Sequence, residues 1–308
     1  MGAMSLSDPQ KRYLDGFIDA YTRRTRASQK QWEEAWPNLA DPRSSEGYFQ
    51  HMLVGGAREY WLATKGLRYP IVADRGDGAH VWDIDGNRYV DFCLGFGVHL
   101  FGHRPAFVED ALRRQLERGM PIGYQSDRAN EVAAAVVKMT GAERVAFCNT
   151  GAEAIMGAVR LARAATGRDT IAVFSQSYHG SYDVTLPAIG MMHGLSSSQK
   201  KDTLVLQYGS ARSLERIAER AGEIAGVLVE TVQPSRPSLQ PVEFLRELRT
   251  LTQNKDIALI FDDILLGFRI HQGGTQAYFG IRADLATYGK IIGGGMDRLN
   301  RLASAILS

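Results

Sequence analysis

The sequence predicts an α/β fold with a mostly parallel sheet that carries helices on both faces. Between residues 104 and 264, segments with helical periodicity alternate with short apolar runs, which is the order found in doubly wound sheets. Runs such as TIAVFSQ (170–176) and IAGVLVETV (224–232) are apolar at consecutive positions, as expected when helices cover both sheet faces. With 308 residues, the chain is long enough to bury a core without disulfides or metals.

We expect the chain to fold in three segments. Residues 1–66 should form a helical N-terminal extension, because RYLDGFIDAYTRRT (12–25) places aromatic and apolar side chains at helical spacing. Residues 1–4 within it are expected to be a remnant of cloning. Residues 67–123 should hold a β-meander, with a hairpin turn at residues 85–87, followed by a helix. Residues 124–308 should hold the large sheet-bearing domain.

Periodicity and turn signals predict the elements of the sheet in order along the chain. Glycines directly follow several of the helical segments, as is common where helices end. Helices are expected at 105–119, 130–141, 152–167, 211–222 and 241–255, and strands at 144–150, 170–176, 203–208, 224–232 and 257–264.

Charge and apolar content exclude several classes of protein. The 36 basic and 34 acidic residues leave a net charge of +2, which gives no electrostatic basis for a nucleic acid or an anionic membrane as partner. No apolar run approaches the roughly 20 residues of a membrane span, and the N-terminus lacks a signal-peptide core. The two cysteines form no metal-binding cluster with histidines, and so few cysteines are typical of a cytoplasmic protein.

Ligands of doubly wound sheets bind beyond the carboxyl ends of the strands. Four predicted strand ends carry polar or aromatic residues, at positions 149–151, 176–180, 230–233 and 262–264. The sequence therefore predicts a ligand site built from these four loops.

The first two loops suggest contacts to an anion and to a flat ring. Thr150-Gly151-Ala152 leads from a strand into a helix, where unpaired N–H groups can bind a phosphate; the alternative is that Thr150 only caps the helix. Tyr178 and His179 also follow a strand. Tyr178 could stack on a ligand ring, or it could be an aromatic of the core.

The last strand and the segment after it add a carboxylate and an amine. Asp262 and Asp263 should point to opposite faces of an extended strand, so one can face the site and the other a structural partner. Asp262 either meets a cation or donors, or is solvated. Lys290 lies among apolar residues and beside glycines 293–295. It is either a lysine that extends to water or a nucleophilic amine. Together, a phosphate cradle, a stacking aromatic, a carboxylate and an amine match pyridoxal 5′-phosphate (PLP).

These residues also carry a resemblance to a known family. The motifs WDIDGNRYVDF, FGH, CNTGAEAIMGAVRLAR, YHG, VLVETVQ, FDDILLGFR and DLATYGKIIGGG occur in this order between residues 82 and 295. They resemble the class III (ω-type) aminotransferases of PLP fold type I, nearest to glutamate-1-semialdehyde aminomutase. GFGVHLFGH (95–103) and the N-terminal extension resemble a narrower group, the aminotransferase modules of polyketide–peptide assembly lines.

The resemblance implies a role for each candidate residue. Lys290 and Asp262 would be catalytic, the first holding the cofactor and the second pairing with its ring nitrogen. The other implied cofactor contacts are Thr150, Gly151, Ala152, Tyr178, His179, Glu230, Gln233 and Ile264, and Phe96 and Val98 are the candidates for substrate contact. Two positions depart from the family pattern: Asp263 stands where Glu is usual, and Ala152 where Ser or Thr is common.

The implied activity is transfer of an amino group to a carbonyl acceptor in a cytoplasmic homodimer. The donor would be an amino acid such as glutamate or glutamine, and one candidate acceptor is a β-ketoacyl thioester on a carrier protein. The first alternative is an intramolecular 2,1-aminomutase. The second is a truncated, non-catalytic remnant or docking domain, because the family continues into a C-terminal small domain. Here DRLNRLASAILS (297–308) follows instead, and this tail does not resemble the family.

Overall fold

The computed structural model describes residues 6–35, 37–39, 64–120, 124–294 and 304–307. The chain divides into two compact units, Met1–Phe92 with Phe101–Ala106, and Cys93–Leu100 with Phe107–Ser308. These limits differ from the three predicted segments, because residues 93–100 and most of the helix that begins at Ala106 belong with the sheet-bearing unit. Among the described residues, no helix is both long and apolar enough to span a membrane.

The smaller unit contains the predicted helices and β-meander. Its elements are α1 (Asp8–Arg24), α2 (Arg26–Ala35), η1 (Lys65–Leu67), β1 (Ala73–Asp77), β2 (His80–Asp83) and β3 (Arg88–Val90). The strands pair antiparallel in the order β1-β2-β3, and Gly86 takes the positive φ of +82° that the hairpin turn requires. The turn's Asp85 accepts hydrogen bonds from the N–H groups of Ala27 and Ser28, at 2.6 and 3.0 Å, and so caps α2. Residues 40–63 of the predicted extension lie outside the described part.

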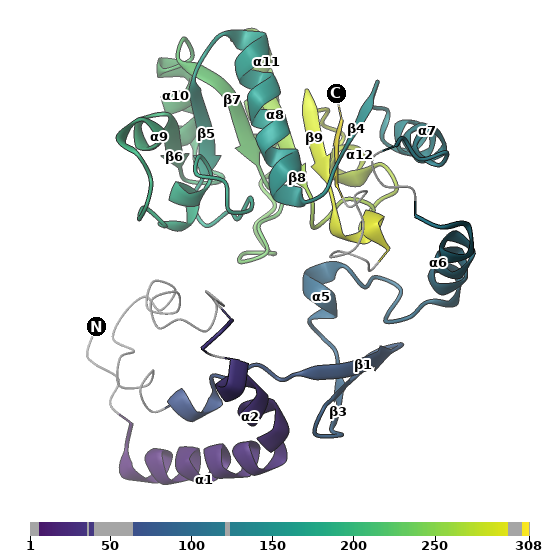
Figure 1. Ribbon diagram of the computed structural model, residues 1–308. Helices are drawn as coiled ribbons and strands as arrows, with labels where there is room; N and C mark the ends of the chain where they lie inside the picture. The colour runs from purple at the N-terminus through teal and green to yellow at the C-terminus, as the bar shows by residue number, and fades with distance from the viewer. Residues whose placement is uncertain (1–5, 36, 40–63, 121–123, 295–303, 308) are drawn as a thin grey trace. The chain divides into compact units, whose positions relative to one another are not determined.

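The larger unit is built on a seven-stranded sheet (Figure 1). Its strands are β4 (Val145–Cys148), β5 (Thr170–Phe174), β6 (Thr203–Leu206), β7 (Ile224–Val229), β8 (Ala258–Asp263), β9 (Leu285–Tyr288) and β10 (Ser304–Leu307). Their order is β4-β10-β9-β8-β7-β5-β6. The pairs from β6 to β9 are parallel, and β10 is antiparallel to both of its neighbours. The predicted mostly parallel α/β sheet is confirmed.

Helices cover both faces of this sheet. The helices of the larger unit are α5 (Leu94–Gly97), α6 (Ala106–Arg118), α7 (Ala129–Thr140), α8 (Gly151–Thr166), α9 (Ser197–Lys201), α10 (Ala211–Glu219), α11 (Val242–Asn254) and α12 (Gly274–Phe279), with the short helices η2 (Leu186–Ile189) and η3 (Lys290–Gly293). In β5, Ala172 and Phe174 join a core cluster that includes residues of α10 and α11. Ile171 and Val173 join a second cluster that includes residues of α8. Successive strand residues therefore reach opposite faces, which explains why the strand is apolar at every position.

The structure corrects the prediction for the end of the chain. Residues 304–307 form β10, which inserts between β4 and β9, although the sequence predicted no strand in this tail. The local sequence did not indicate this strand, and pairing with two distant strands decides the outcome. The strand β9 and the helix α12 were not predicted either.

Candidate active site

The predicted loops meet at one edge of the sheet in the larger unit. Because β5, β7, β8 and β9 are parallel, the residues that follow them come together. They border a cavity of about 720 Å³, called the candidate cavity below. It is lined by Phe96, Thr150, Gly151, Ala152, Ile155, Tyr178, His179, Gly180, Ser181, Glu230, Pro234, Asp262, Ile264, Leu265 and Lys290.

The start of α8 forms one wall of the candidate cavity. The Thr150 hydroxyl accepts a hydrogen bond from the Glu153 N–H at 3.1 Å, and the Glu153 carboxylate accepts one from the Asn149 N–H at 2.6 Å. Thr150 is therefore a helix cap, as the alternative interpretation expected. The first N–H groups of the helix, at Gly151 and Ala152, have no carbonyl partner within it. The helix start can thus be capped and still present donors to an anion.

Two glycines keep this wall close to its neighbours. A Cβ atom at Gly151 would lie 3.2 Å from the Ile264 side chain. A Cβ atom at Gly180 would lie 2.8 Å from the Cβ of Ala152, and Gly180 has a φ of +83°. Only a residue without a side chain fits here comfortably, so the loop after β5 packs directly on the helix start.

A buried histidine–aspartate pair lies on the floor of the candidate cavity. His179 Nδ1 is 2.6 Å from Asp262 Oδ2, and both side chains are almost fully buried. An ionised carboxylate only accepts hydrogen bonds, so Nδ1 carries the proton. The other oxygen, Oδ1, accepts a hydrogen bond from the Ile264 N–H at 3.1 Å. His179 Nε2 is buried without a hydrogen-bond partner. The sequence placed both residues at the site but did not predict that they pair.

A second carboxylate, Glu230, shares this buried region. It is 7% exposed, and one of its oxygens accepts a hydrogen bond from the Tyr178 N–H at 3.3 Å. Burial, and after it the negative charge of Asp262, raise the pKa of Glu230 to about 7, although His179 acts in the opposite direction. Glu230 can therefore hold or release a proton near neutral pH.

Asp263 points away from Asp262, which confirms the prediction of opposite faces. Its two oxygens accept hydrogen bonds from the N–H and the hydroxyl of Thr275, at 2.8 and 2.5 Å. Burial raises the pKa of Asp263 to about 6. This pair ties β8 to the start of α12, so the shorter carboxylate at this position has a structural partner.

Lys290 and Phe96 reach the candidate cavity from backbone in the left-handed region. Lys290 directly follows β9 and Gly289, with a φ of +50°. Phe96 belongs to the turn Leu94–Gly97, in which all four residues have positive φ. A left-handed conformation costs roughly 1–2 kcal/mol for each residue that is not glycine. Strain of this kind is common at functional sites and persists only where the surrounding structure holds it.

Two predicted site residues do not line the candidate cavity. The Gln233 amide donates to the Ser177 hydroxyl at 2.7 Å and to the Ser175 carbonyl at 3.0 Å, and its oxygen accepts from Arg236. Gln233 therefore uses its amide to fix the loop before Tyr178 and not to face a ligand. Val98 is only 5% exposed and packs inside the unit, because the chain turns inward directly after Gly97.

Sequence reasoning missed several residues of the lining. Leu265 and Pro234 directly follow predicted site residues, so chain position could have indicated them. Ile155 lies one turn into α8 from Gly151. Tyr178, one of the predicted residues in the lining, is 55% exposed. Its ring is therefore accessible to a ligand in the cavity.

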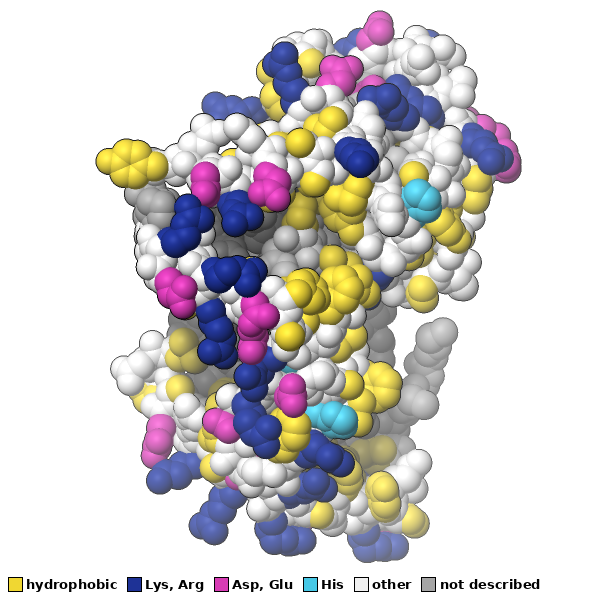
Figure 2. Space-filling view, turned by 90° about the vertical axis from the view of Figure 1, so that its right-hand side faces the viewer, with side chains coloured by type: hydrophobic (Ala, Val, Ile, Leu, Met, Phe, Trp, Pro, Cys, Tyr) yellow, Lys and Arg dark blue, Asp and Glu magenta, His cyan; other side chains and the backbone are white. Residues whose placement is uncertain are grey.

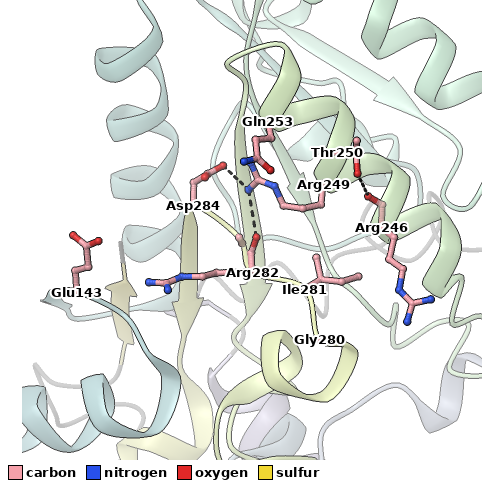
Figure 3. Close-up of a pocket in the computed structure, with 10 residues that line it drawn as sticks. Glu143, Arg246, Arg249, Thr250, Gln253, Gly280, Ile281, Arg282 and Asp284 are labelled. Atoms are coloured by element: carbon pink, nitrogen blue, oxygen red, sulfur yellow. Dashed lines mark hydrogen bonds and ion pairs between the residues drawn. The ribbon is translucent and has the colours of Figure 1, made fainter.

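A second cavity, of about 710 Å³, lies at the opposite edge of the sheet (Figure 3). Arg249 donates to the carboxylate of Asp284, which precedes β9, at 2.9 Å, and the same carboxylate accepts from the N–H of Leu259 at 2.7 Å. Ligands of such sheets bind at the carboxyl ends of the strands, so this cavity is not the candidate active site.

On the molecular face shown in Figure 2, acidic side chains lie among the basic ones, so the surface charge on that face is mixed.

Comparison with known proteins gives consistent matches. The family described as Aminotransferase class-III matches residues 62–305, a range that reaches into β10. The glutamate-1-semialdehyde 2,1-aminomutase of Archaeoglobus fulgidus is 37% identical over 239 residues, which are 74% of this chain and 57% of that protein.

Solved structures agree in fold. An omega-transaminase from Sphaerobacter thermophilus matches with a TM-score of 0.78 and 28% identity, over 92% of this chain and 63% of that one. A PLP form of the FumI protein from Sphingopyxis sp. MTA144 matches with a TM-score of 0.74 and 25% identity, over 92% and 64%. The chain thus spans less than two thirds of the length of each of these proteins.

Proposed function

The chain belongs to the class-III aminotransferase family, and on that basis we propose that it binds PLP in the candidate cavity and transfers an amino group. The donor amine is oxidised to a carbonyl while the acceptor carbonyl is reduced to an amine, so atoms and electrons balance. The observation that carries the proposal is that Lys290 and the buried His179–Asp262 pair border the same cavity.

The residues present fit this cofactor. Lys290 would hold it through its amine, and Asp262 would meet its ring nitrogen. The N–H groups of Gly151 and Ala152 would receive the phosphate, in the cradle that a Cβ atom at Gly151 or Gly180 would fill. Tyr178 and Ile264, both in the lining, would cover the ring. When bound, PLP supplies an electron sink that stabilises negative charge on the carbon that loses a proton.

The chain's own groups would then position charge and move protons. Asp262 is held in place by hydrogen bonds with His179 and the Ile264 N–H, so its carboxylate would be positioned to stabilise a protonated ring nitrogen. The Lys290 Nζ atom would act as general base and acid toward the substrate carbon. Glu230, with a pKa near 7, can be neutral at this end of the cavity and so limits the negative charge beside Asp262.

Covalent capture of PLP tests the proposal. PLP is titrated into the chain, the bond between cofactor and amine is made permanent with borohydride, and mass spectrometry identifies the modified peptide. We expect one adduct on Lys290 and none in Lys290→Ala. Lys200→Ala, which removes an exposed lysine of α9, is the matched control and should label as the unmodified chain does. If Lys290 is not labelled at saturating PLP, the proposal is refuted, and the alternative of a non-catalytic remnant is favoured.

The aminomutase reaction is a second candidate function. It is favoured by the similarity to glutamate-1-semialdehyde 2,1-aminomutases such as that of Archaeoglobus fulgidus. A mutase moves the amino group within one molecule, whereas a transferase needs a separate donor. Two assays distinguish the reactions. In the first, the chain is incubated with glutamate-1-semialdehyde alone. In the second, it is incubated with a carbonyl acceptor and nitrogen-labelled glutamate or glutamine. Product in the first assay indicates the mutase, and label in the acceptor indicates the transferase.

The proposal also includes an acceptor substrate and an oligomeric state. An acyl thioester on a carrier protein is proposed as acceptor because Phe96, Ile264 and Leu265 give one side of the lining an apolar character. A homodimer is proposed because of the family, and light scattering of the purified chain tests it. The expected cytoplasmic location stays a prediction.

A further inference from the structure

We propose that the left-handed turn Leu94–Gly97 makes the candidate cavity selective for substrates with an uncharged, apolar chain. Phe96 is the side chain that contacts this chain, and Arg269 is the positioning residue that holds Phe96 in place. The inference rests on the proposed function, because it assigns the substrate class of that same cavity.

The turn is unusual in its backbone. Leu94, Gly95, Phe96 and Gly97 have φ angles of +48°, +61°, +55° and +92°, and the Val98 N–H closes the turn on the Leu94 carbonyl. Two of these residues are not glycine, and such residues seldom adopt this region even singly. Strain of this kind persists only where other contacts hold it, so the surroundings of the turn must supply them.

Arg269 supplies the main contact. One of its Nη atoms donates a hydrogen bond to the Gly97 carbonyl. A Cβ atom at Gly97 would lie 2.8 Å from Leu265 and 3.2 Å from that same Arg269 nitrogen, so the turn packs tightly on the segment after β8. Arg269 itself does not line the candidate cavity. Its effect on a ligand must therefore act through the turn.

The turn presents Phe96 to the candidate cavity. Phe96 is 73% exposed and lines the cavity together with the apolar side chains of Ile155 and Leu265. The exposed surface of the Phe96 ring is therefore available to contact a ligand. This wall is therefore suited to a hydrocarbon chain.

The charges of the lining point the same way. Among the described lining residues, Lys290 is the sole lysine or arginine, and the proposed function uses it for the cofactor. His179 is paired with Asp262. No further lysine or arginine of the described lining is left for a substrate carboxylate. A charged chain would lose its hydration without a partner.

Stable adducts of the cofactor with amines test this selectivity without turnover. The probes are the reduced phosphopyridoxyl adducts of propylamine, hexylamine and 6-aminohexanoate, and calorimetry gives each Kd. We expect the hexyl adduct to bind about tenfold more tightly than the propyl adduct, since burying three methylenes favours binding by at least this factor. It should also bind about tenfold more tightly than the carboxylate adduct.

Variants assign the selectivity to the turn. Phe96→Ala and Arg269→Met should each reduce the hexyl-to-propyl ratio to less than about threefold. Arg269→Lys keeps a donor and should restore part of the ratio, which a loss of general stability would not do. Leu161→Ala removes an exposed leucine of α8 outside the lining and should keep the full ratio.

The outcomes separate this inference from the proposed function. An unchanged ratio in Phe96→Ala or Arg269→Met, with normal PLP binding, overturns the inference and leaves the proposed function intact. Tightest binding of the carboxylate adduct to the unmodified chain also overturns it. If neither PLP nor any adduct binds, the proposed function itself fails, and the inference falls with it.

Discussion

Glu230 provides a quantitative test of the buried charge at the candidate active site. Burial and the charge of Asp262 raise its pKa from an ordinary 4.5 to about 7. Well below pH 4.5 the carboxyl is neutral in both the folded and the unfolded chain, so its titration does not change the free energy of unfolding. As the pH rises from there toward 7, the unfolded chain ionises first, so the folded chain binds more protons and its stability falls. The full loss is about 3 kcal/mol, because each pKa unit corresponds to about 1.4 kcal/mol.

Glu230→Gln removes this titration while preserving the shape of the side chain. The free energy of unfolding is measured in urea at about pH 5 and about pH 8, without PLP, for the variant and the unmodified chain. Between the lower and the higher pH, we expect the free energy of unfolding of the variant to rise by about 2–3 kcal/mol relative to that of the unmodified chain. Any pH-independent cost of the amide cancels in this comparison, and so does the titration of Asp263, which both chains share.

The control is Glu215→Gln, which removes an exposed carboxyl of α10 and reports the effect of one charge fewer. The reasoning about Glu230 is refuted if Glu230→Gln and the unmodified chain differ by the same free energy at both pH values. A shift in favour of the unmodified chain at the higher pH would mean that Glu230 is stabilised as an anion.

Two further predictions concern the packing around the site. Thr275→Val removes the hydroxyl that donates to Asp263 and should lower the free energy of unfolding by about 1–3 kcal/mol, since a buried carboxyl loses a donor; a urea titration that shows a loss below about 0.5 kcal/mol would contradict this. Gly180→Ala should lower the stability by about 1–3 kcal/mol more than Gly190→Ala. Both glycines have positive φ, but an added Cβ meets Ala152 only at Gly180 and nothing within 4 Å at Gly190. Equal losses in thermal unfolding would show that backbone conformation, and not the contact with Ala152, decides the cost.

Local patterns were sufficient to predict the frame of the larger unit. The predicted helices and strands between residues 105 and 264 correspond to α6, α7, α8, α10 and α11 and to β4, β5, β6, β7 and β8, each of which shows helical periodicity or an apolar run. The short helices η2 and α9 in the same range were not predicted. The opposite directions of Asp262 and Asp263 followed from the alternation of an extended strand. The rule that ligands bind at the carboxyl ends of strands then indicated the loops that border the candidate cavity.

Contacts between distant segments decided what local patterns could not. Strand β10 forms because β4 and β9 flank residues 304–307, although the run is short. Gln233 does not face the cavity because its amide donates a hydrogen bond to Ser177, 56 residues away in the chain.

The sequence by itself determined the fold class, the edge of the sheet where the site lies, and the family resemblance, since these depend on residue types and their order. Only the tertiary structure decided that His179 pairs with Asp262, that Glu230 titrates near neutral pH, and that Arg269 holds the turn that carries Phe96. The physical reason is that hydrogen-bond geometry, burial and backbone strain depend on which groups from distant parts of the chain come within a few ångströms of each other.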